Sequence, residues 1–249
     1  MILGFAAILA LAAALFVAVA WPRVDLRRRL EVEGIEDREA VEAYDRISRW
    51  PQFRLLRHLI VRELRRYRPQ GVLADMGCGP GRLSVEIARA FPHLQTLGVD
   101  ASEAMIRAAA ANASSLGPSV QVRFLAGNVL DLPLQDEAID FAISTLSLHH
   151  WSDAERGLSE IHRVLKPGGQ LLLFDLRRDP RRLFYLLLRF AQACVVPAAL
   201  RRAGEPVGSV LSSHTPRETD AYFSRSQFEQ WRVRGGIGWM FVWGQKRDG

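Results

Sequence analysis

Cysteine and lysine are both scarce in this sequence of 249 residues, and each scarcity excludes something. The two cysteines, Cys78 and Cys194, have no C-x-x-C spacing, so they make neither a zinc site nor a disulfide framework, which fits a reducing compartment. Lysine occurs only at Lys166 and Lys246, so the formal net charge of +6 comes almost entirely from arginine. That excess would suit nucleic acid or an anionic membrane surface, and charge alone does not choose between them. The sequence also lacks internal repeats and any cluster of metal-ligating residues, so no metal is expected.

Charge is absent from residues 2–21, which also contain no proline and a single glycine. Twenty helical residues cover about 30 Å, the hydrocarbon thickness of a bilayer. Trp21 closes this run, and a basic cluster follows it directly: Arg23, Arg27, Arg28 and Arg29. The pattern predicts a single-pass transmembrane anchor over residues 1–21 in the inner membrane, with the rest of the chain on the cytoplasmic side. The alternative is a cleaved signal peptide, because Ala18-Val19-Ala20 resembles a cleavage site, although no basic residue precedes the run.

The pattern of the remaining chain changes at Pro69 from helices to strands that alternate with helices. Residues 36–68 carry apolar residues at helical spacing, and Pro51 divides them into two helices, the second of which Pro69 ends. We predict strands over residues 72–75, 96–99, 120–125, 139–144 and 170–175, helices over 82–90, 102–115 and 153–164, and a terminal β-hairpin from 231–234 and 237–243. This order predicts an α/β fold: a Rossmann-like, doubly wound sheet of seven strands, parallel apart from an antiparallel strand of the terminal hairpin.

The predicted organisation has three parts: the anchor (1–21), a basic juxtamembrane segment with helices (22–69), and the α/β domain (70–249). One insertion, over about 177–213, interrupts the alternation of strands and helices. Its first part holds seven arginines around an apolar run, and Arg189 and Pro197 make it a poor spanning helix. We therefore expect an amphipathic cap there, with membrane contact over residues 181–202.

Three glycines at alternate positions, Gly77, Gly79 and Gly81, join the first strand of the domain to its helix. Such a turn lets the backbone approach a ligand and directs helix N-terminal amides at it. A dinucleotide-binding turn has its last glycine where this chain has Arg82, which counts against a nicotinamide oxidoreductase. Asp100 ends the second strand, where a carboxylate can accept both hydroxyls of a ribose.

Four segments, LADMGCGPGRLS, AGNVLDLPL, DEAIDFAISTLSLHHW and EIHRVLKPGGQLLLFDL, follow one another over about residues 70–176. In this order they resemble the class I S-adenosylmethionine-dependent methyltransferases, especially the small-molecule branch that includes the ubiquinone/menaquinone C-methylases (methyltransferase type 11). The resemblance implies S-adenosyl-L-methionine as cofactor. The implied binding residues are Asp75, Gly77, Cys78, Gly79, Gly81, Asp100, Ala101, Met105, Asn128, Val129, Ser144 and Thr145. Many relatives have aspartate where Asn128 stands, and an asparagine amide can still read an adenine edge.

Methyl transfer from a sulfonium depends more on positioning and exclusion of water than on reactive side chains. If the acceptor must lose a proton, the candidate bases are His149, His150 and Asp175, near the carboxyl ends of strands. The alternative for the two histidines is a structural role in the turn after the fourth strand. Tyr44 matches a tyrosine that relatives place over the cofactor, and it can equally be a packed aromatic of a helix. Cys78 is expected to fill space within the turn, because nothing nearby is placed to activate it.

We therefore expect a membrane-anchored methyltransferase of class EC 2.1.1 that acts on a small or lipophilic acceptor at the cytoplasmic membrane face. The alternative is a non-catalytic, cofactor-binding scaffold anchored in the membrane. A nucleic-acid acceptor is not expected, because the chain has no N/D-P-P-Y tetrapeptide and no appended RNA-binding module. The acceptor itself, and the choice among carbon, oxygen and nitrogen methylation, are not encoded in these patterns.

Overall fold

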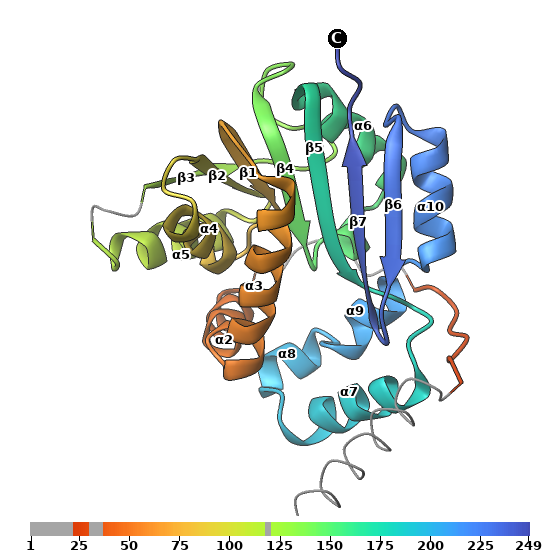
Figure 1. Ribbon diagram of the computed structural model, residues 1–249. Helices are drawn as coiled ribbons and strands as arrows, with labels where there is room; N and C mark the ends of the chain where they lie inside the picture. The colour runs from red at the N-terminus through yellow and green to blue at the C-terminus, as the bar shows by residue number, and fades with distance from the viewer. Residues whose placement is uncertain (1–21, 30–36, 118–120) are drawn as a thin grey trace, which may run out of the picture.

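Seven strands form one sheet in the computed structural model, which describes residues 22–29, 37–117 and 121–249 (Figure 1). The strands are β1 (Val72–Met76), β2 (Gln95–Asp100), β3 (Val122–Ala126), β4 (Ile139–Thr145), β5 (Leu165–Leu176), β6 (Gln230–Gly235) and β7 (Trp239–Gln245). Their order is β3-β2-β1-β4-β5-β7-β6; the first five are parallel, and β7 runs antiparallel to β5 and β6. The predicted Rossmann-like sheet of seven strands with an antiparallel terminal strand is confirmed.

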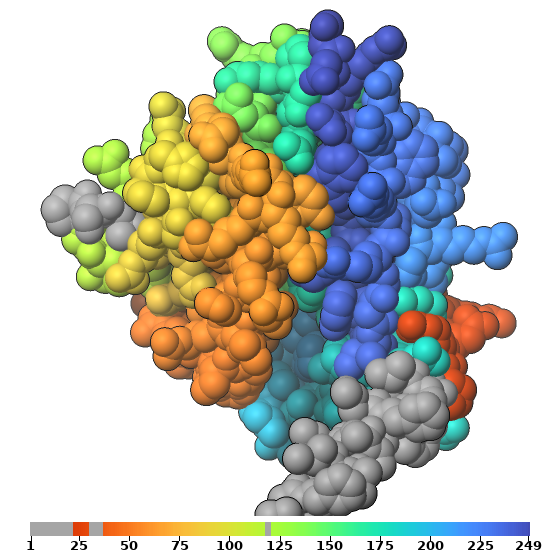
Figure 2. Space-filling model, in the orientation of Figure 1, coloured from red at the N-terminus to blue at the C-terminus, as the bar shows by residue number. Residues whose placement is uncertain are grey.

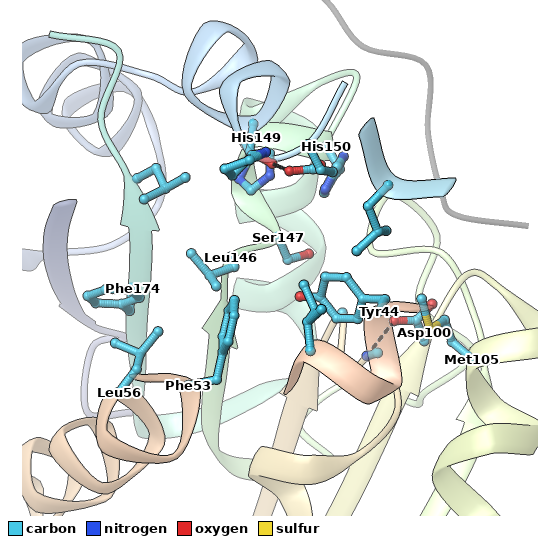
Figure 3. A pocket seen from close by; sticks show the side chains of 18 of the residues that line it. Tyr44, Phe53, Leu56, Asp100, Met105, Leu146, Ser147, His149, His150 and Phe174 are labelled. Atoms are coloured by element: carbon cyan, nitrogen blue, oxygen red, sulfur yellow. Dashed lines mark hydrogen bonds between the residues drawn. The ribbon is translucent and has the colours of Figure 1, made fainter. Parts of the chain in front are cut away.

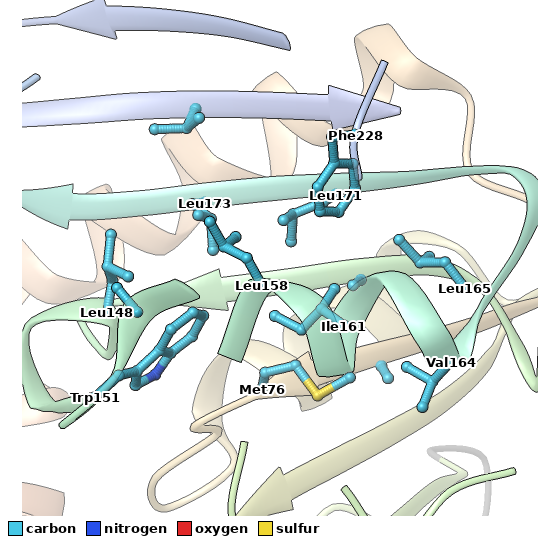
Figure 4. Close-up of a cluster of buried hydrophobic side chains, with 14 of the residues drawn as sticks. Met76, Leu148, Trp151, Leu158, Ile161, Val164, Leu165, Leu171, Leu173 and Phe228 are labelled. Atoms are coloured by element: carbon cyan, nitrogen blue, oxygen red, sulfur yellow. The ribbon is translucent and has the colours of Figure 1, made fainter. Parts of the chain in front are cut away.

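Helices cover both faces of the sheet because the central strands β1, β4 and β5 carry apolar side chains on both faces. The helices are α2 (Arg38–Ser48), α3 (Pro51–Leu64), α4 (Arg82–Ala90), α5 (Glu103–Ser114), α6 (Ala154–Val164), α7 (Arg182–Cys194), α8 (Ala198–Arg202), α9 (Val207–Ser212) and α10 (Pro216–Arg225). On one face, Leu158 and Ile161 of α6 pack with Leu171 and Leu173 of β5 (Figure 4). On the other face, α3 and α4 bury their apolar side chains against β1, β4 and β5.

The segment between β5 and β6 is helical, and its first three helices, α7, α8 and α9, are called the cap below. They lie beyond the carboxyl ends of the parallel strands (Figure 1). The cap is joined to the N-terminal helices through α8, where Ala199 and Leu200 share a buried cluster with Ala43 and Ile47 of α2. Chain order reverses between β1 and β4, which is where open α/β sheets bind their ligands. The cap therefore covers the expected site.

Two predicted boundaries differ from the structure by more than two residues. The sequence predicts that β5 begins at Gln170, whereas it begins at Leu165. The first residues of β5 pair with residues near the C-terminus: Gly168 N donates to Arg247 O (3.0 Å). The helix that Pro69 was predicted to end stops at Leu64, and a short 3₁₀ turn (Arg65–Tyr67) follows.

The predicted membrane anchor, residues 1–21, lies outside the described residues, as does Val120, the predicted start of the third strand. Within residues 22–29, 37–117 and 121–249, no helix combines the length and the apolar character that crossing a bilayer requires.

Candidate functional site

A cavity of about 560 Å³ lies between the carboxyl ends of the strands and the cap. Its sheet side is lined by polar groups from the ends of β1, β2 and β3, among them Gly79, Asp100 and Asn128. The opposite side is apolar and is formed by side chains of α2, α3, α7, α8 and β7. Figure 2 shows a hollow between α3 (orange) and β7 (dark blue), the elements that carry the lining residues Leu56 and Trp239. One cavity thus joins a polar half to an apolar half.

The glycine turn lies in the polar half, and each of its glycines has a positive φ: 72° at Gly77, 52° at Gly79 and 70° at Gly81. A Cβ at Gly77 would lie 2.1 Å from Ser147 Oγ, so this position also needs glycine for packing. At Gly79 the nearest atom to a Cβ is Tyr44 Cε1 at 3.8 Å. Gly77 and Gly79 line the cavity, so the backbone of the turn is accessible to a ligand there.

Asp75 lies directly before the turn and is 1% exposed. Ser84 Oγ donates to its Oδ2 at 2.6 Å, whereas its Oδ1 has no hydrogen-bond partner among the described residues. Burial raises the pKa of Asp75 to about 7; the Ser84 hydrogen bond opposes this shift and the charge of Asp100 adds to it. The half-buried Asp100 lines the cavity and the buried Asp75 lies behind it, so the charge in this part of the site suits a cationic ligand such as S-adenosylmethionine.

Asp100, at the end of β2, holds the turn in place through both carboxylate oxygens. Gly79 N donates to Oδ2 at 2.7 Å, the dashed line in Figure 3, and Ser102 N donates to Oδ1 at 2.9 Å. Burial raises the pKa of Asp100, and these two hydrogen bonds oppose that shift. Ala101 and Met105 line the cavity beside it.

Asn128 and Val129 line the same polar half after β3. Asn128 Oδ1 accepts a hydrogen bond from Leu130 N at 2.9 Å, which leaves the amide Nδ2 as a donor for a ligand. One cavity therefore brings together seven of the residues predicted to bind the turn side, the ribose and the adenine of the cofactor: Gly77, Gly79, Asp100, Ala101, Met105, Asn128 and Val129.

Five predicted cofactor residues do not line the cavity: Asp75, Cys78, Gly81, Ser144 and Thr145. Ser144 Oγ donates to Met76 O at 2.8 Å and so joins β4 to β1. Burial, with Asp75 and Asp100 nearby, raises the thiol pKa of Cys78 well above its usual range, in agreement with a space-filling role.

The wall after β4 is formed instead by Leu146 and Ser147. Leu146 has a φ of 53°, a conformation that leucine rarely adopts and that no sequence pattern indicated.

Arg82, where a dinucleotide fingerprint has glycine, holds α2 onto the turn. Its Nε donates to Asp45 Oδ1 at 3.0 Å and its Nη2 to Asn112 Oδ1 at 2.8 Å; these three residues are called the Arg82 cluster. Burial opposes ionisation of Asp45, but hydrogen bonds from arginines and from Asn112 outweigh it and lower its pKa. The cluster places the neighbouring Tyr44 over Gly79, inside the cavity (Figure 3). Burial raises the pKa of Tyr44, so its phenol stays neutral.

His149 and Asp175 form a buried pair at the boundary of the two halves. The distance from His149 Nδ1 to Asp175 Oδ1 is 2.7 Å, and the backbone N of His149 donates to Asp175 Oδ2 at 2.9 Å. A carboxylate in this position favours the tautomer with the proton on Nδ1, so Nε2 carries the lone pair. His149 lines the cavity, and Asp175 lies behind it.

His150 also lines the cavity (Figure 3). Burial, with His149 adding, lowers its pKa to about 3, so this ring stays neutral.

Glu205, from the cap, is a cavity residue that the sequence analysis missed. Ser209 Oγ donates to its Oε2. Burial raises the pKa of Glu205; His149 opposes the shift and Asp175 adds to it. The sequence offered one faint signal, since Glu205 ends a stretch, residues 180–204, that contains no acidic residue.

The comparisons with known proteins agree with this geometry. A family model described as a methyltransferase domain matches residues 74–173. The chain is 32% identical over 177 residues to a 2-phytyl-1,4-naphtoquinone methyltransferase of a Nostoc species, covering 69% of this chain and 76% of the relative. It is 30% identical over 207 residues to a ubiquinone/menaquinone biosynthesis C-methyltransferase of Syntrophotalea carbinolica, covering 83% and 78%. A crystal structure described as a putative S-adenosylmethionine-dependent methyltransferase from Methanococcus maripaludis superposes with a TM-score of 0.67 at 19% identity, over 88% of this chain and 97% of that one.

Proposed function

The chain belongs to the class I S-adenosylmethionine-dependent methyltransferases of the small-molecule branch, and from that premise we propose that it methylates a lipophilic, quinol-like acceptor at the cytoplasmic face of a membrane. The observation that carries the proposal is the cavity itself. Its polar half has the turn, Asp100 and Asn128 for a nucleoside, and its apolar half has room and surface for a ring with a hydrocarbon tail. Similarity to relatives named as methyltransferases does not favour the non-catalytic scaffold.

The apolar half is suited to an aromatic acceptor. Phe53, Phe174 and Trp239 line it together with aliphatic residues of α7 and α8. Flat rings pack against such side chains, and burial of the acceptor would exclude water from the reacting atoms. Relatives named for naphthoquinone and for ubiquinone and menaquinone support a ring of this class.

When bound, S-adenosylmethionine supplies an electrophilic methyl group. A quinol ring carbon that accepts a methyl group must give up its own proton, so the site needs a base. We assign that proton to Nε2 of His149, because Asp175 fixes the proton on Nδ1 and would stabilise the imidazolium that forms. Glu205 lines the same part of the cavity and would orient a ring hydroxyl. His150, whose pKa is about 3, is not suited to accept a proton at neutral pH.

The membrane location rests on sequence. The uncharged run at residues 2–21 and the arginines after it support an anchor with the domain on the cytoplasmic side. Anchoring would keep the enzyme next to an acceptor that is dissolved in the bilayer. Mass spectrometry of the mature N-terminus tests it: loss of about twenty residues would indicate a cleaved signal peptide instead.

The acceptor class is tested with 2-phytyl-1,4-naphthoquinone, kept reduced as its quinol, in detergent with labelled S-adenosylmethionine. We expect a ring-methylated product, and a protein that binds the cofactor by calorimetry yet methylates no quinol would contradict the proposal. His149→Asn should lower kcat by about 10²-fold or more. The matched variant His150→Asn should lower it less than about tenfold, since a neutral lining residue supplies only packing. Equal losses in the two variants would contradict the assignment of the base.

A further inference from the structure

Helix α7 exposes large apolar side chains to an unusual extent. Leu186, Leu187 and Phe190 are 47%, 58% and 63% exposed, and none of the 13 residues of α7 is buried. These three side chains are called the outer face of α7. The other exposed large hydrophobic residues in the described ranges are Val195, which follows α7 directly, Leu55 and Leu59 of α3, and Leu116 after α5. A solvent-exposed apolar face of this kind marks an interaction surface.

Another side of the same helix lines the cavity. Phe184, Leu188 and Ala191 follow one another at helical spacing, and all three are lining residues. The helix is therefore apolar on two sides, one toward the cavity and one toward solvent.

The chain that precedes the described residues joins the molecule at α7. Arg182 N, in the first turn of the helix, donates to Pro22 O at 2.9 Å, and Val24 N donates to Pro180 O at 3.0 Å. Pro22 directly follows the uncharged run of residues 2–21. The described chain therefore begins beside the first turn of α7.

The charged residues of α7 itself are both arginines. Arg182 and Arg189 are exposed, and neither forms an ion pair with a described residue. Arg23, at the start of the helix, has its pKa lowered by burial and by the neighbouring Arg177 and Arg181, and Asp179 only partly offsets this. An apolar helix face that carries the exposed Arg182 and Arg189 is complementary to a bilayer with anionic headgroups.

We propose that the outer face of α7 docks on an anionic lipid surface and places the apolar half of the cavity against the bilayer. Three observations support the lipid contact: the exposed apolar side chains of the outer face, the arginines of α7, and the position of Pro22 beside the start of the helix. That the acceptor enters beside α7 from the lipid rests on the proposed function. A second copy of this chain on the outer face is the competing occupant, and the experiment separates the two.

The test uses the full chain in vesicles of phosphatidylcholine and phosphatidylglycerol. Cys194, which is exposed, is replaced by serine, and Cys78 stays because it is buried. A polarity-sensitive fluorophore is attached at Leu187→Cys or, as control, at Leu116→Cys, an exposed leucine after α5 on another part of the fold. Both proteins keep residues 1–21, so they carry the same predicted anchor and differ only in the position of the label.

We expect a lipid-tethered quencher to remove about half or more of the emission at 187 and little at 116. Equal quenching at the two positions would overturn the proposal. A blue shift at 187 that grows with protein concentration and shows no lipid quenching would also overturn it, in favour of a second copy.

A variant separates docking from catalysis. Leu187→Asn with Phe190→Asn changes no lining residue, so it should keep its rate on quinol in detergent micelles and lose about fivefold or more on quinol in vesicles. An unchanged rate in vesicles would overturn entry beside α7. If the unsubstituted chain methylates no quinol in either medium, the proposed function fails while the quenching result still decides the docking.

Discussion

Asp75→Asn should stabilise the protein, and by more at pH 8 than at pH 5. The carboxyl is 1% exposed, and burial raises its pKa from 3.8 to about 7. A folded state with the higher pKa binds the proton more tightly than the unfolded chain. Stability from this group is therefore fully present below about pH 4, is lost as the pH rises, and stays low above about pH 7.

The magnitude follows from the two pKa values. The full difference corresponds to about 4 kcal/mol, of which about 2.5 kcal/mol falls between pH 5 and pH 8. Asparagine keeps an oxygen that can accept from Ser84 Oγ but carries no charge. The free energy of unfolding of Asp75→Asn minus that of the unsubstituted protein should therefore be about 2.5 kcal/mol larger at pH 8 than at pH 5.

The assay is urea unfolding of the full chain in detergent at pH 5, 6, 7 and 8, with Asp136→Asn as control for the loss of a surface charge. Asp136 is 75% exposed, so its variant should show a nearly constant difference. A constant difference for Asp75→Asn as well would refute the reasoning. Saturating S-adenosylmethionine should flatten the pH dependence of the unsubstituted protein, because a cation near the site favours the ionised carboxyl.

Three further outcomes are expected. Gly81→Ala should lower the melting temperature far more than Gly117→Ala: both have positive φ, but a Cβ at Gly81 meets side-chain atoms at 2.8 Å and one at Gly117 meets nothing within 4 Å. Asp100→Asn should weaken S-adenosylmethionine binding in calorimetry about tenfold. The carboxylate accepts from Gly79 N on one oxygen and from Ser102 N on the other, and an amide has only one oxygen. Arg82→Lys should raise the calorimetric Kd for the cofactor several-fold and leave kcat nearly unchanged. Lysine lacks the planar guanidinium that donates to Asp45 and Asn112 at once, so α2 would be held less firmly over the glycine turn.

Local patterns predicted the sheet and the polar half of the site, because those depend on short-range signals. Glycines at alternate positions, an acid at a strand end and strands spaced by helices are all visible within a few dozen residues. The wall after β4 was not predictable: the family resemblance implied Ser144 and Thr145, but the chain turns at Leu146 in a left-handed conformation. Which side chains line the cavity there is set by that turn.

The apolar half was hidden for a different reason. It is assembled from segments far apart in the chain, such as Phe53 of α3, Phe174 of β5 and Leu200 of α8. Each of these residues alone reads as ordinary core or surface. The arginine-flanked apolar run of α7 did predict an amphipathic cap, but the sequence could not divide its apolar residues between the cavity and the outer face.

The Arg82 cluster has a consequence for how the enzyme opens. Because Arg82 and Asn112 bind Asp45, helix α2 is fastened to α4 and α5 and moves with the sheet as one rigid body. Helix α8 of the cap is itself joined to α2, so the hinge for exchange of ligands is expected at α7, on the acceptor side of the cavity. The nucleoside would leave through another wall. A spent cofactor and a methylated product then need not depart in a fixed order, and product-inhibition kinetics would reveal a random release.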